Sequence, residues 1–347
     1  MAKPAGRNSV ETASASGVAS SAQAFDRLQA LVAEDLEQVN QLIQQRMVSE
    51  HAPLIPELAA HLVGAGGKRL RPILTLAAAR LCGYEGAHHI RLAATVEFIH
   101  SATLLHDDVV DESALRRGQA TANILWGNKP SVLVGDFLFS RSFQLMVETE
   151  SLRVLEILSN ASAIIAEGEV LQLSMVNKIS EDDSIYMQVI RGKTAALFEA
   201  ATQVGGVIAG VSPEQEAALA TYGDRLGVAF QLADDALDYG GLEARIGKSI
   251  GDDFREGKAT LPVIRAYQAA DAEERAFWKR CIEKRDQTDD DLDHALKLIA
   301  KHGALEATLM EARDHIDAAR STLKAFPESP VRQALEDVAE FVVARAS

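Results

Sequence analysis

The chain has 347 residues, of which 50 are acidic and 35 are basic, so its formal net charge at pH 7 is −15. This acidity argues against a nucleic acid as partner, because binding a polyanion requires a basic surface. Hydrophobic residues make up 47% of the chain and aromatic residues only 5%. The core must therefore consist mainly of Ala, Leu, Val and Ile, which favours a helical protein over a β-sandwich or barrel.

Residues 1–22 are rich in Ser, Ala and Gly and show no helical period. We therefore expect a disordered N-terminal tail there and no secretory signal, with a transit peptide as the less favoured alternative. No apolar run approaches the ~20 residues that would span a bilayer. Cys82 and Cys281 lie far apart and outside any metal-ligand spacing, which favours structural thiols in a reduced, cytoplasmic protein.

Apolar residues recur at helical spacing along the rest of the chain. In the first half, helical or strongly apolar segments cover 25–47, 55–63, 72–81, 90–110, 131–147 and 152–175. In the second half, the expected helices cover 212–239, 260–270, 273–284, 292–300, 305–323 and 331–344. Because no alternating strand of useful length appears, we expect an all-α protein with a single helical domain over residues 23–347.

Two helix starts are predicted from caps. Ser180 precedes a run of acidic residues, and Ser212 precedes Pro213 and, three positions on, Gln215. A serine hydroxyl accepts a hydrogen bond from the first helical turn, acidic residues favour that turn, and proline suits its first position. We therefore expect helices to begin at Ser180 and at Ser212.

A D-D-x-x-D motif ends the long apolar helix predicted over 90–110. It consists of Asp107, Asp108 and Asp111. On a helix Asp107 and Asp111 share one face, and clustered carboxylates suit Mg²⁺, which completes its shell with water and phosphate oxygens. Arg116 and Arg117 follow within two turns, and arginine favours phosphate. These residues suggest a diphosphate site, with a solvated acidic helix end as the alternative.

A second D-D-x-x-D motif ends the helix predicted over 212–239. It consists of Asp234, Asp235 and Asp238. Gln231 lies on the same stripe of the helix, and Gly223 and Gly227 continue it, which predicts close packing or room for a ligand. The repeated spacing suggests that metal ions bridge both clusters to one diphosphate, although two separate solvated ends remain the alternative.

Basic residues lie beside both motifs. Lys68 and Arg71 follow a double glycine, where the backbone can approach an anion closely. Lys248 and Lys258 lie in the loop after the second motif. Each is weak evidence alone, and their grouping beside glycine turns and acidic clusters favours anion binding.

Together these residues resemble the all-trans polyprenyl diphosphate synthases, most closely the long-chain octaprenyl to decaprenyl type. The resemblance is carried by G-G-K-R-L-R-P at Gly66–Pro72, Glu97 and His100, the first aspartate motif, R-R-G at Arg116–Gly118, G-D-F-L at Gly135–Leu138, G-K-T at Gly192–Thr194, F-Q-L-A-D-D-A-L-D-Y at Phe230–Tyr239, and G-K-x-x-G-D-D-F from Gly247. It implies antiparallel helices around a deep central cavity, usually in a homodimer. It also implies head-to-tail condensation of isopentenyl diphosphate onto farnesyl or geranylgeranyl diphosphate, to give a long-chain product for the ubiquinone side chain.

The resemblance also implies a role for each matching residue. The aspartates of both motifs would hold about two to three Mg²⁺ ions, with Asp107, Asp111 and Asp234 as direct ligands. All of them except Asp238 would act in catalysis, together with Arg116 and Lys193. Isopentenyl diphosphate would bind to Lys68, Arg71, His100 and Arg117. The allylic diphosphate would bind to Arg116, Lys193, Thr194, Gln231, Lys248 and Lys258.

Product length should depend on the helix before Asp107, since a helix rises ~1.5 Å per residue and earlier turns would line the cavity. In the family that this chain resembles, a bulky residue at the position of Ala102 stops growth early, so the small Ala102 favours a long product. Phe98 could point into the cavity or into the core. His100 lies on the same face as Asp107, whereas His106 lies off it and is interpreted as structural.

Four other functions are weighed against this one. A short-chain synthase is disfavoured by Ala102, and a terpene cyclase by the basic residues from Lys68 to Arg71. A non-catalytic subunit of a synthase complex would usually lose one aspartate motif, and an acidic helical scaffold would need neither. The oily product also suggests transient contact with a membrane surface.

Overall fold

The structure, a computed structural model, describes residues 23–64, 67–240 and 250–344. The predicted tail 1–22 and Lys248 lie outside these ranges. The chain divides into two compact units. Of the described residues, those within Met1–Ala30, Val170–Ile190 and Val228–Ser347 form unit 1, and those within Leu31–Glu169 and Arg191–Gly227 form unit 2.

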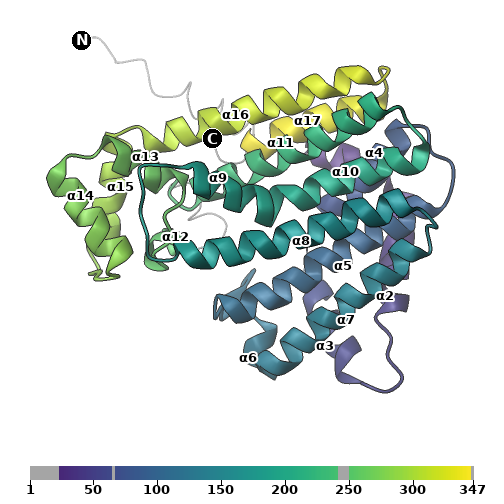
Figure 1. The fold of residues 1–347 in the computed structure, drawn as a ribbon, viewed down its shortest axis with the longest axis horizontal. Helices are drawn as coiled ribbons and strands as arrows, with labels where there is room; N and C mark the ends of the chain where they lie inside the picture. The colour runs from purple at the N-terminus through teal and green to yellow at the C-terminus, as the bar shows by residue number, and fades with distance from the viewer. Residues whose placement is uncertain (1–22, 65–66, 241–249, 345–347) are drawn as a thin grey trace, which may run out of the picture. The chain divides into compact units, whose positions relative to one another are not determined.

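Unit 2 is built around one long helix. Its elements are α2 (Ala33–Arg46), α3 (Leu54–Gly64), α4 (Leu70–Leu81), α5 (His88–Val110), β1 (Leu115–Arg116), β2 (Gln119–Ala120), α6 (Ala122–Trp126), α7 (Asn128–Val147), the π-helix η1 (Arg191–Ala195), α10 (Ala196–Ala209) and the larger parts of α8 (Leu152–Met175) and α11 (Pro213–Leu237). Helix α5 packs against α2, α4, α7 and α10 (Figure 1). It is apolar on several sides, as a helix surrounded by others must be.

Unit 1 contains most of the C-terminal half. Its elements are the helical residues 23–30, α9 (Ser184–Ile190), α12 (Asp252–Arg255), α13 (Leu261–Ala269), α14 (Ala272–Trp278), the π-helix η3 (Lys279–Glu283), α15 (Asp291–Lys301), α16 (Ala304–Thr322), the 3-10 helix η4 (Leu323–Ala325) and α17 (Pro330–Ala344). Trp278 and Phe254 are fully buried at the centre of its core. The Cys281 thiol lies in the same core.

The all-α prediction is confirmed in the described residues, where the only strands are the two short ones of the β1–β2 hairpin. The cap at Ser212 is also confirmed, because Gln215 N donates to Ser212 Oγ over 3.3 Å and Ser212 N donates to Gln215 Oε1 over 3.4 Å. The helix start at Ser180 is wrong, since α9 begins at Ser184. Ser180 Oγ instead accepts from Asp182 N, which forms a turn before the helix.

The glycines of α11 confirm the predicted close packing within unit 2. A Cβ added at Gly223 would lie 2.4 Å from the carbonyl O of Phe198, and one at Gly227 would lie 2.6 Å from Ala195 Cα. No larger residue fits either position without moving the backbone. The stripe that leads to Asp234 therefore begins as a contact between helices.

Both cysteines are free thiols, as predicted. Burial raises the pKa of Cys82 and of Cys281 to about 11. A thiol with such a high pKa is a poor nucleophile, which fits a structural role. Across residues 23–64, 67–240 and 250–344, none of the helices combines the length and the hydropathy that crossing a bilayer requires.

Candidate active site

The first aspartate cluster lies at the C-terminal end of α5. Asp111 caps the helix, and its backbone N–H donates to the carbonyl O of Asp107 over 2.8 Å. Asp108 is buried, Asp107 is half-buried and Asp111 is exposed. The motif therefore presents three carboxylates in three environments, although they are neighbours in sequence.

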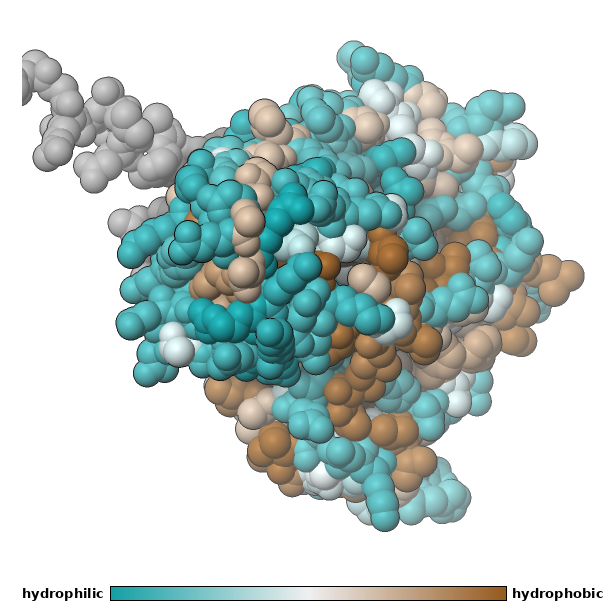
Figure 2. Space-filling view, turned by 60° about the vertical axis from the view of Figure 1, so that its left-hand side comes forward, coloured by the Kyte–Doolittle hydropathy of each residue, from teal (hydrophilic) through white to brown (hydrophobic). Residues whose placement is uncertain are grey.

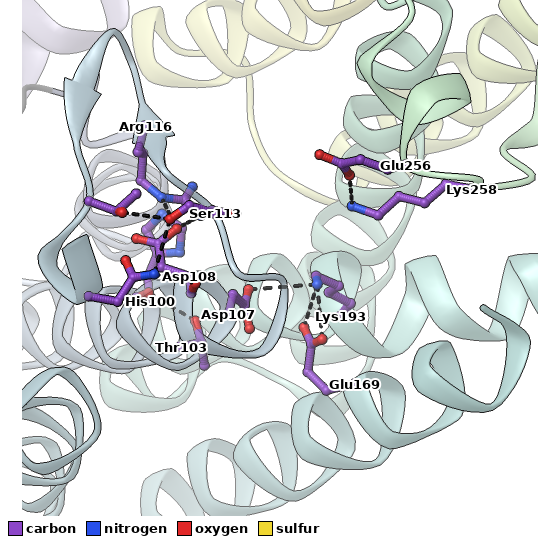
Figure 3. Close-up of polar contacts among 12 residues, drawn as sticks. His100, Thr103, Asp107, Asp108, Ser113, Arg116, Glu169, Lys193, Glu256 and Lys258 are labelled. Atoms are coloured by element: carbon purple, nitrogen blue, oxygen red, sulfur yellow. Dashed lines mark hydrogen bonds and ion pairs between the residues drawn. The ribbon is translucent and has the colours of Figure 1, made fainter. Parts of the chain in front are cut away.

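Asp108 points toward the β1–β2 hairpin. Its Oδ1 accepts from Arg116 Nε over 2.9 Å and from Arg116 Nη2 over 2.7 Å (Figure 3). The buried Asn123 closes the same loop by donating to the carbonyl O atoms of Asp108 and Ser113, both over 3.1 Å. The middle aspartate thus holds Arg116, one of the two arginines that the sequence predicted as phosphate ligands.

Asp107 points instead toward Lys193. The Nζ atom of Lys193 lies 3.7 Å from Asp107 Oδ2 and 2.9 Å from Glu169 Oε2 (Figure 3). Burial raises the pKa of Asp107 to about 7; Lys193 lowers it, whereas Glu169 and Asp111 raise it. Lys193 is a predicted site residue, and Glu169 is one that the sequence analysis missed.

The position of Lys193 follows from a tight contact between backbones. Lys193 and the buried Thr194 lie in η1, a π-helical turn that leads directly into α10. A Cβ added at Gly168 would lie 2.9 Å from Lys193 N, and one at Gly192 would lie 3.0 Å from Gly168 Cα. Two glycines therefore allow η1 to approach α8 closely, and this approach brings Lys193 to Glu169.

A group of arginines lies between the start of α4 and the middle of α5. We call Arg69, Arg71, Glu97, His100 and Arg117 the arginine cluster. Arg69 forms an ion pair with the buried Glu97, and Arg71 Nη1 lies 3.3 Å from His100 Nε2. A Cβ at Gly67 would lie 2.7 Å from Arg117 Nη1, so the glycine backbone packs directly against that guanidinium.

The charges of the arginine cluster are unbalanced. Burial lowers the pKa of Arg71 to about 10 and raises the pKa of Glu97, which Arg69 lowers in turn. Burial and the surrounding arginines hold the pKa of His100 well below its usual range. His100 is therefore neutral, and its Nε2 accepts from Arg71 because arginine can only donate. Three arginines share one carboxylate, which leaves positive charge for an anion.

The second aspartate cluster lies at the end of α11. Its buried carboxylate, Asp235, has different hydrogen-bond partners from those of Asp108. Asp235 is buried and accepts from Tyr186 Oη over 2.5 Å and from Gln231 Nε2 over 2.7 Å. Burial raises the pKa of Asp235 to about 7, although both hydrogen bonds lower it. Gln231, predicted as a substrate ligand, thus contacts an aspartate of its own cluster, and Asp234 is half-buried beside it.

The third aspartate of this cluster holds the next turn of the chain. Asp238 accepts from the backbone N–H groups of Asp252 and Asp253, each over 3.1 Å, at the start of α12. Lys258, another predicted ligand, lies 2.6 Å from Glu256 Oε2 (Figure 3). Lys68 is exposed just before α4, while Ala102 and Phe98 are buried within α5.

The donor chemistry fits a hard divalent cation. Within the described part of the chain, no three His, Cys, Asp or Glu side chains form a ready-made metal cage. Cations such as Mg²⁺ are usually bound through one or two carboxylates together with substrate phosphates and water. Asp107, which is half-buried, and Asp111, which is exposed, lie four residues apart at the end of α5 and offer that kind of incomplete site.

Sequence reasoning missed four residues of the site: Glu169, Glu97 as the partner of an arginine, Arg69 and Tyr186. None of them lies in a D-D-x-x-D motif, and each takes part through a contact with a distant segment. Glu97 and Arg69 belong to the stretches that resemble the family, so the sequence missed only the ion pair between them. For Glu169 the one available signal was the preceding Gly168 in an otherwise regular helix.

The chain is similar to known proteins over most of its length. Residues 52–299 match the polyprenyl synthetase family. The octaprenyl diphosphate synthase of Escherichia coli strain K12 is 46% identical over 321 residues, which cover 92% of this chain and 99% of that protein. The resemblance seen in the motifs therefore extends over nearly the whole chain.

Two solved structures share the fold. A decaprenyl diphosphate synthase from Rhodobacter capsulatus has a TM-score of 0.90 and 63% identity, covering 93% of this chain and 99% of that one. A polyprenyl synthase from Caulobacter crescentus CB15, complexed with calcium and isoprenyl diphosphate, has a TM-score of 0.89 and 54% identity, covering 93% and 98%. The predicted fold class is confirmed, and the chain belongs to the polyprenyl synthetase family.

Proposed function

We propose that this chain is a long-chain all-trans polyprenyl diphosphate synthase. It condenses isopentenyl diphosphate head-to-tail onto an allylic diphosphate, farnesyl or geranylgeranyl diphosphate. The observation that carries the proposal is the arginine cluster, which lies in the same unit as the first aspartate cluster. Its excess positive charge suits a second diphosphate, whereas a terpene cyclase binds a single diphosphate and needs no such cluster.

The allylic diphosphate is assigned to the aspartate clusters. Asp107, Asp111 and Asp234 would hold about two to three Mg²⁺ ions together with its phosphate oxygens. Once bound, Mg²⁺ supplies Lewis-acid stabilisation of the negative charge that grows as the C–O bond breaks. Lys193 and Arg116 donate to the same diphosphate. The Caulobacter crescentus relative, solved with calcium and isoprenyl diphosphate, supports a divalent cation and a diphosphate ligand here.

The remaining aspartates act by holding their neighbours. Asp108 fixes Arg116, and Asp235 fixes Gln231. Asp238 anchors α12, and thereby the segment that leads to Lys258. We assign these residues, with Thr194 and Lys248, to the allylic diphosphate side of the reaction.

Isopentenyl diphosphate is assigned to Lys68, Arg71, His100 and Arg117. The neutral His100 accepts from Arg71, which leaves the other Arg71 donors for phosphate. When the allylic C–O bond breaks, the double bond of isopentenyl diphosphate attacks the allylic cation and forms one C–C bond. The proton lost from the new chain passes to the departing diphosphate, so no side chain has to act as a nucleophile.

A long product is favoured by the relatives and by α5. Octaprenyl and nonaprenyl diphosphate synthases are 46% and 42% identical to this chain, and the small Ala102 lies five residues before Asp107. We propose that Ala102 and Phe98 set the product length, that the product becomes a ubiquinone side chain, and that the enzyme works in the cytoplasm. Release of so apolar a product would require transient contact with a membrane.

We also propose that the enzyme is a homodimer. Helix α7 exposes Leu133, Phe143 and Val147 along one stripe, and α6 exposes Ile124 and Leu125. Figure 2 shows apolar residues gathered over part of the surface, which is unusual for an isolated soluble chain. A second copy of the chain would cover these side chains, as two-fold dimers cover identical patches. Sedimentation at micromolar concentration should show a dimer, and a monomer would contradict it.

One assay tests the proposed reaction. Radiolabelled isopentenyl diphosphate is incubated with farnesyl diphosphate and the protein, with and without a chelator, and the products are separated by chromatography. We expect long-chain product with Mg²⁺ and none after chelation. A product that stops at geranylgeranyl diphosphate would identify a short-chain synthase, and the absence of any product would identify a non-catalytic subunit.

A further inference from the structure

We propose that Glu169 is a positioning residue that holds the Lys193 ammonium group away from Asp107, so that Asp107 stays available to a divalent cation. This inference rests on the proposed function, since it concerns how the allylic diphosphate site is prepared. The three groups lie in unit 2 and are seen together in Figure 3.

The distances show how Lys193 is divided between two carboxylates. Its Nζ atom lies 2.9 Å from both oxygens of Glu169 and 3.7 Å from Asp107 Oδ2. The side chains of Asp107, Glu169 and Lys193 are 14%, 20% and 25% exposed, so water screens the three charges only in part. The stronger ion pair is therefore the one with Glu169.

The backbone keeps this geometry from relaxing. Gly168, directly before Glu169, contacts Gly192, directly before Lys193, and neither position has room for a Cβ. The two side chains thus start from backbones in direct contact. Lys193 has a long side chain, but its backbone position is fixed by this contact.

The consequence for a cation follows from charge. Without the Glu169 carboxylate, Asp107 is the one that remains of these two, and it attracts the Lys193 ammonium group. Lys193 would then compete with a divalent cation for the same oxygens. Loss of the Glu169 charge also makes the surroundings less attractive to any cation, so both effects weaken metal binding.

Glu169→Gln is the main variant, with Glu167→Gln as its matched control. Glu167 lies two residues earlier on α8 and is exposed, so its substitution removes the same charge from the same helix. Isothermal titration calorimetry, in which Mg²⁺ is added to the protein in the presence of inorganic diphosphate, measures the affinity for Mg²⁺ without turnover. We expect Glu169→Gln to weaken Mg²⁺ binding by about tenfold or more, and Glu167→Gln to leave it within about twofold.

Lys193→Gln shows whether Glu169 acts through the lysine. In the Lys193→Gln background, Glu169→Gln should weaken Mg²⁺ binding much less than it does in the parent protein, because the competing cation is gone. An equal loss in both backgrounds would overturn the positioning role. Glu169→Asp should restore part of the affinity, and thermal unfolding in EDTA confirms that each variant is folded.

Turnover measurements separate this inference from the proposed reaction. In Glu169→Gln, the Mg²⁺ concentration for half-maximal rate should rise while the KM for isopentenyl diphosphate stays the same. If the parent protein makes polyprenyl product but its Glu169→Gln variant binds Mg²⁺ as tightly as the parent, only the role of Glu169 is rejected. A parent protein that makes no product, but whose Mg²⁺ binding depends on Glu169, would reject only the reaction.

Discussion

The two aspartate clusters have the same spacing but stabilise their buried middle carboxylates differently. Asp108 receives both of its described side-chain hydrogen bonds from the cation Arg116. Asp235 receives its bonds from Tyr186 and Gln231, which are neutral donors. The spacing therefore determines only which face of a helix the carboxylates occupy. Whether a buried carboxylate is neutralised by a cation depends on the segment that packs over it.

The largest expected effect comes from removing a direct metal ligand of either cluster. Asp107→Ala and Asp234→Ala should each lower the condensation rate by roughly 10²–10³-fold, because both clusters are proposed to act on one diphosphate. Steady-state rates with Mg²⁺ measure this, and Asp289→Ala on the exposed surface is the control. A near-normal rate in either variant would show that its cluster does not bind the catalytic metal.

Glu97→Gln tests the arginine cluster, which lies in the same unit as the first aspartate cluster. Without the carboxylate, Arg69 loses its ion pair, and the arginine side chains are no longer held in their present positions. The KM for isopentenyl diphosphate should rise about tenfold, while the KM for the allylic diphosphate stays nearly constant. Equal changes in both constants would mean that the two diphosphates do not occupy separate sites.

The pH dependence of stability sharpens the contrast between the middle aspartates. Burial raises the pKa of Asp235 to about 7, against ~3.9 in an unfolded chain. The folded protein therefore holds this proton more tightly, and the free energy of unfolding of metal-free protein falls as pH rises from about 4 to about 7. Asp235→Asn should remove roughly 1–3 kcal/mol of that fall.

Denaturant unfolding in EDTA at pH 5 and pH 8 measures this difference. Asp108→Asn is the contrasting variant, because it breaks an ion pair with Arg116 and should lower stability at both pH values. An Asp235→Asn protein whose stability depends on pH as steeply as the parent would show that other groups cause the fall.

The smallest expected effect on rate comes from Ala102→Phe, which changes the helix below the first cluster. The first condensations should proceed at a similar rate, since no group near the diphosphates changes. Chromatography should show a shorter product because the ring blocks the path of the growing chain. An active variant with an unchanged product distribution would place the determinant of length elsewhere.

Sequence periodicity predicted the long elements well, and the bounds expected for 152–175 are those of α8. It failed for short or irregular ones. Helix α6 has five residues, fewer than two turns, and a π-helix such as η1 keeps the apolar pattern of its neighbours. The cap at Ser180 failed because a serine hydroxyl can stabilise a turn as well as a helix.

The acidic motifs were visible in the sequence because the aspartates of each lie close together along the chain. Lys68, Arg71 and Lys193 were visible because they fall in stretches that resemble a known family. Glu169 was not, since it meets Lys193 only where Gly168 and Gly192 let two segments touch. The inward orientation of Asp108 was equally hidden, because it depends on how the β1–β2 hairpin folds back. Composition and spacing describe one helix at a time, whereas these contacts join two.

The π-helical turn η1 has a consequence for how the sequence can change. A π-turn accommodates one residue more than an α-turn, and each residue of a helix rotates the next by about 100°. Deleting one residue between Arg191 and Ala195 would restore a regular helix while turning Lys193 away from Glu169. A single-residue insertion or deletion is harmless in many surface loops. In η1 it would separate Lys193 from Glu169, although neither residue had been substituted.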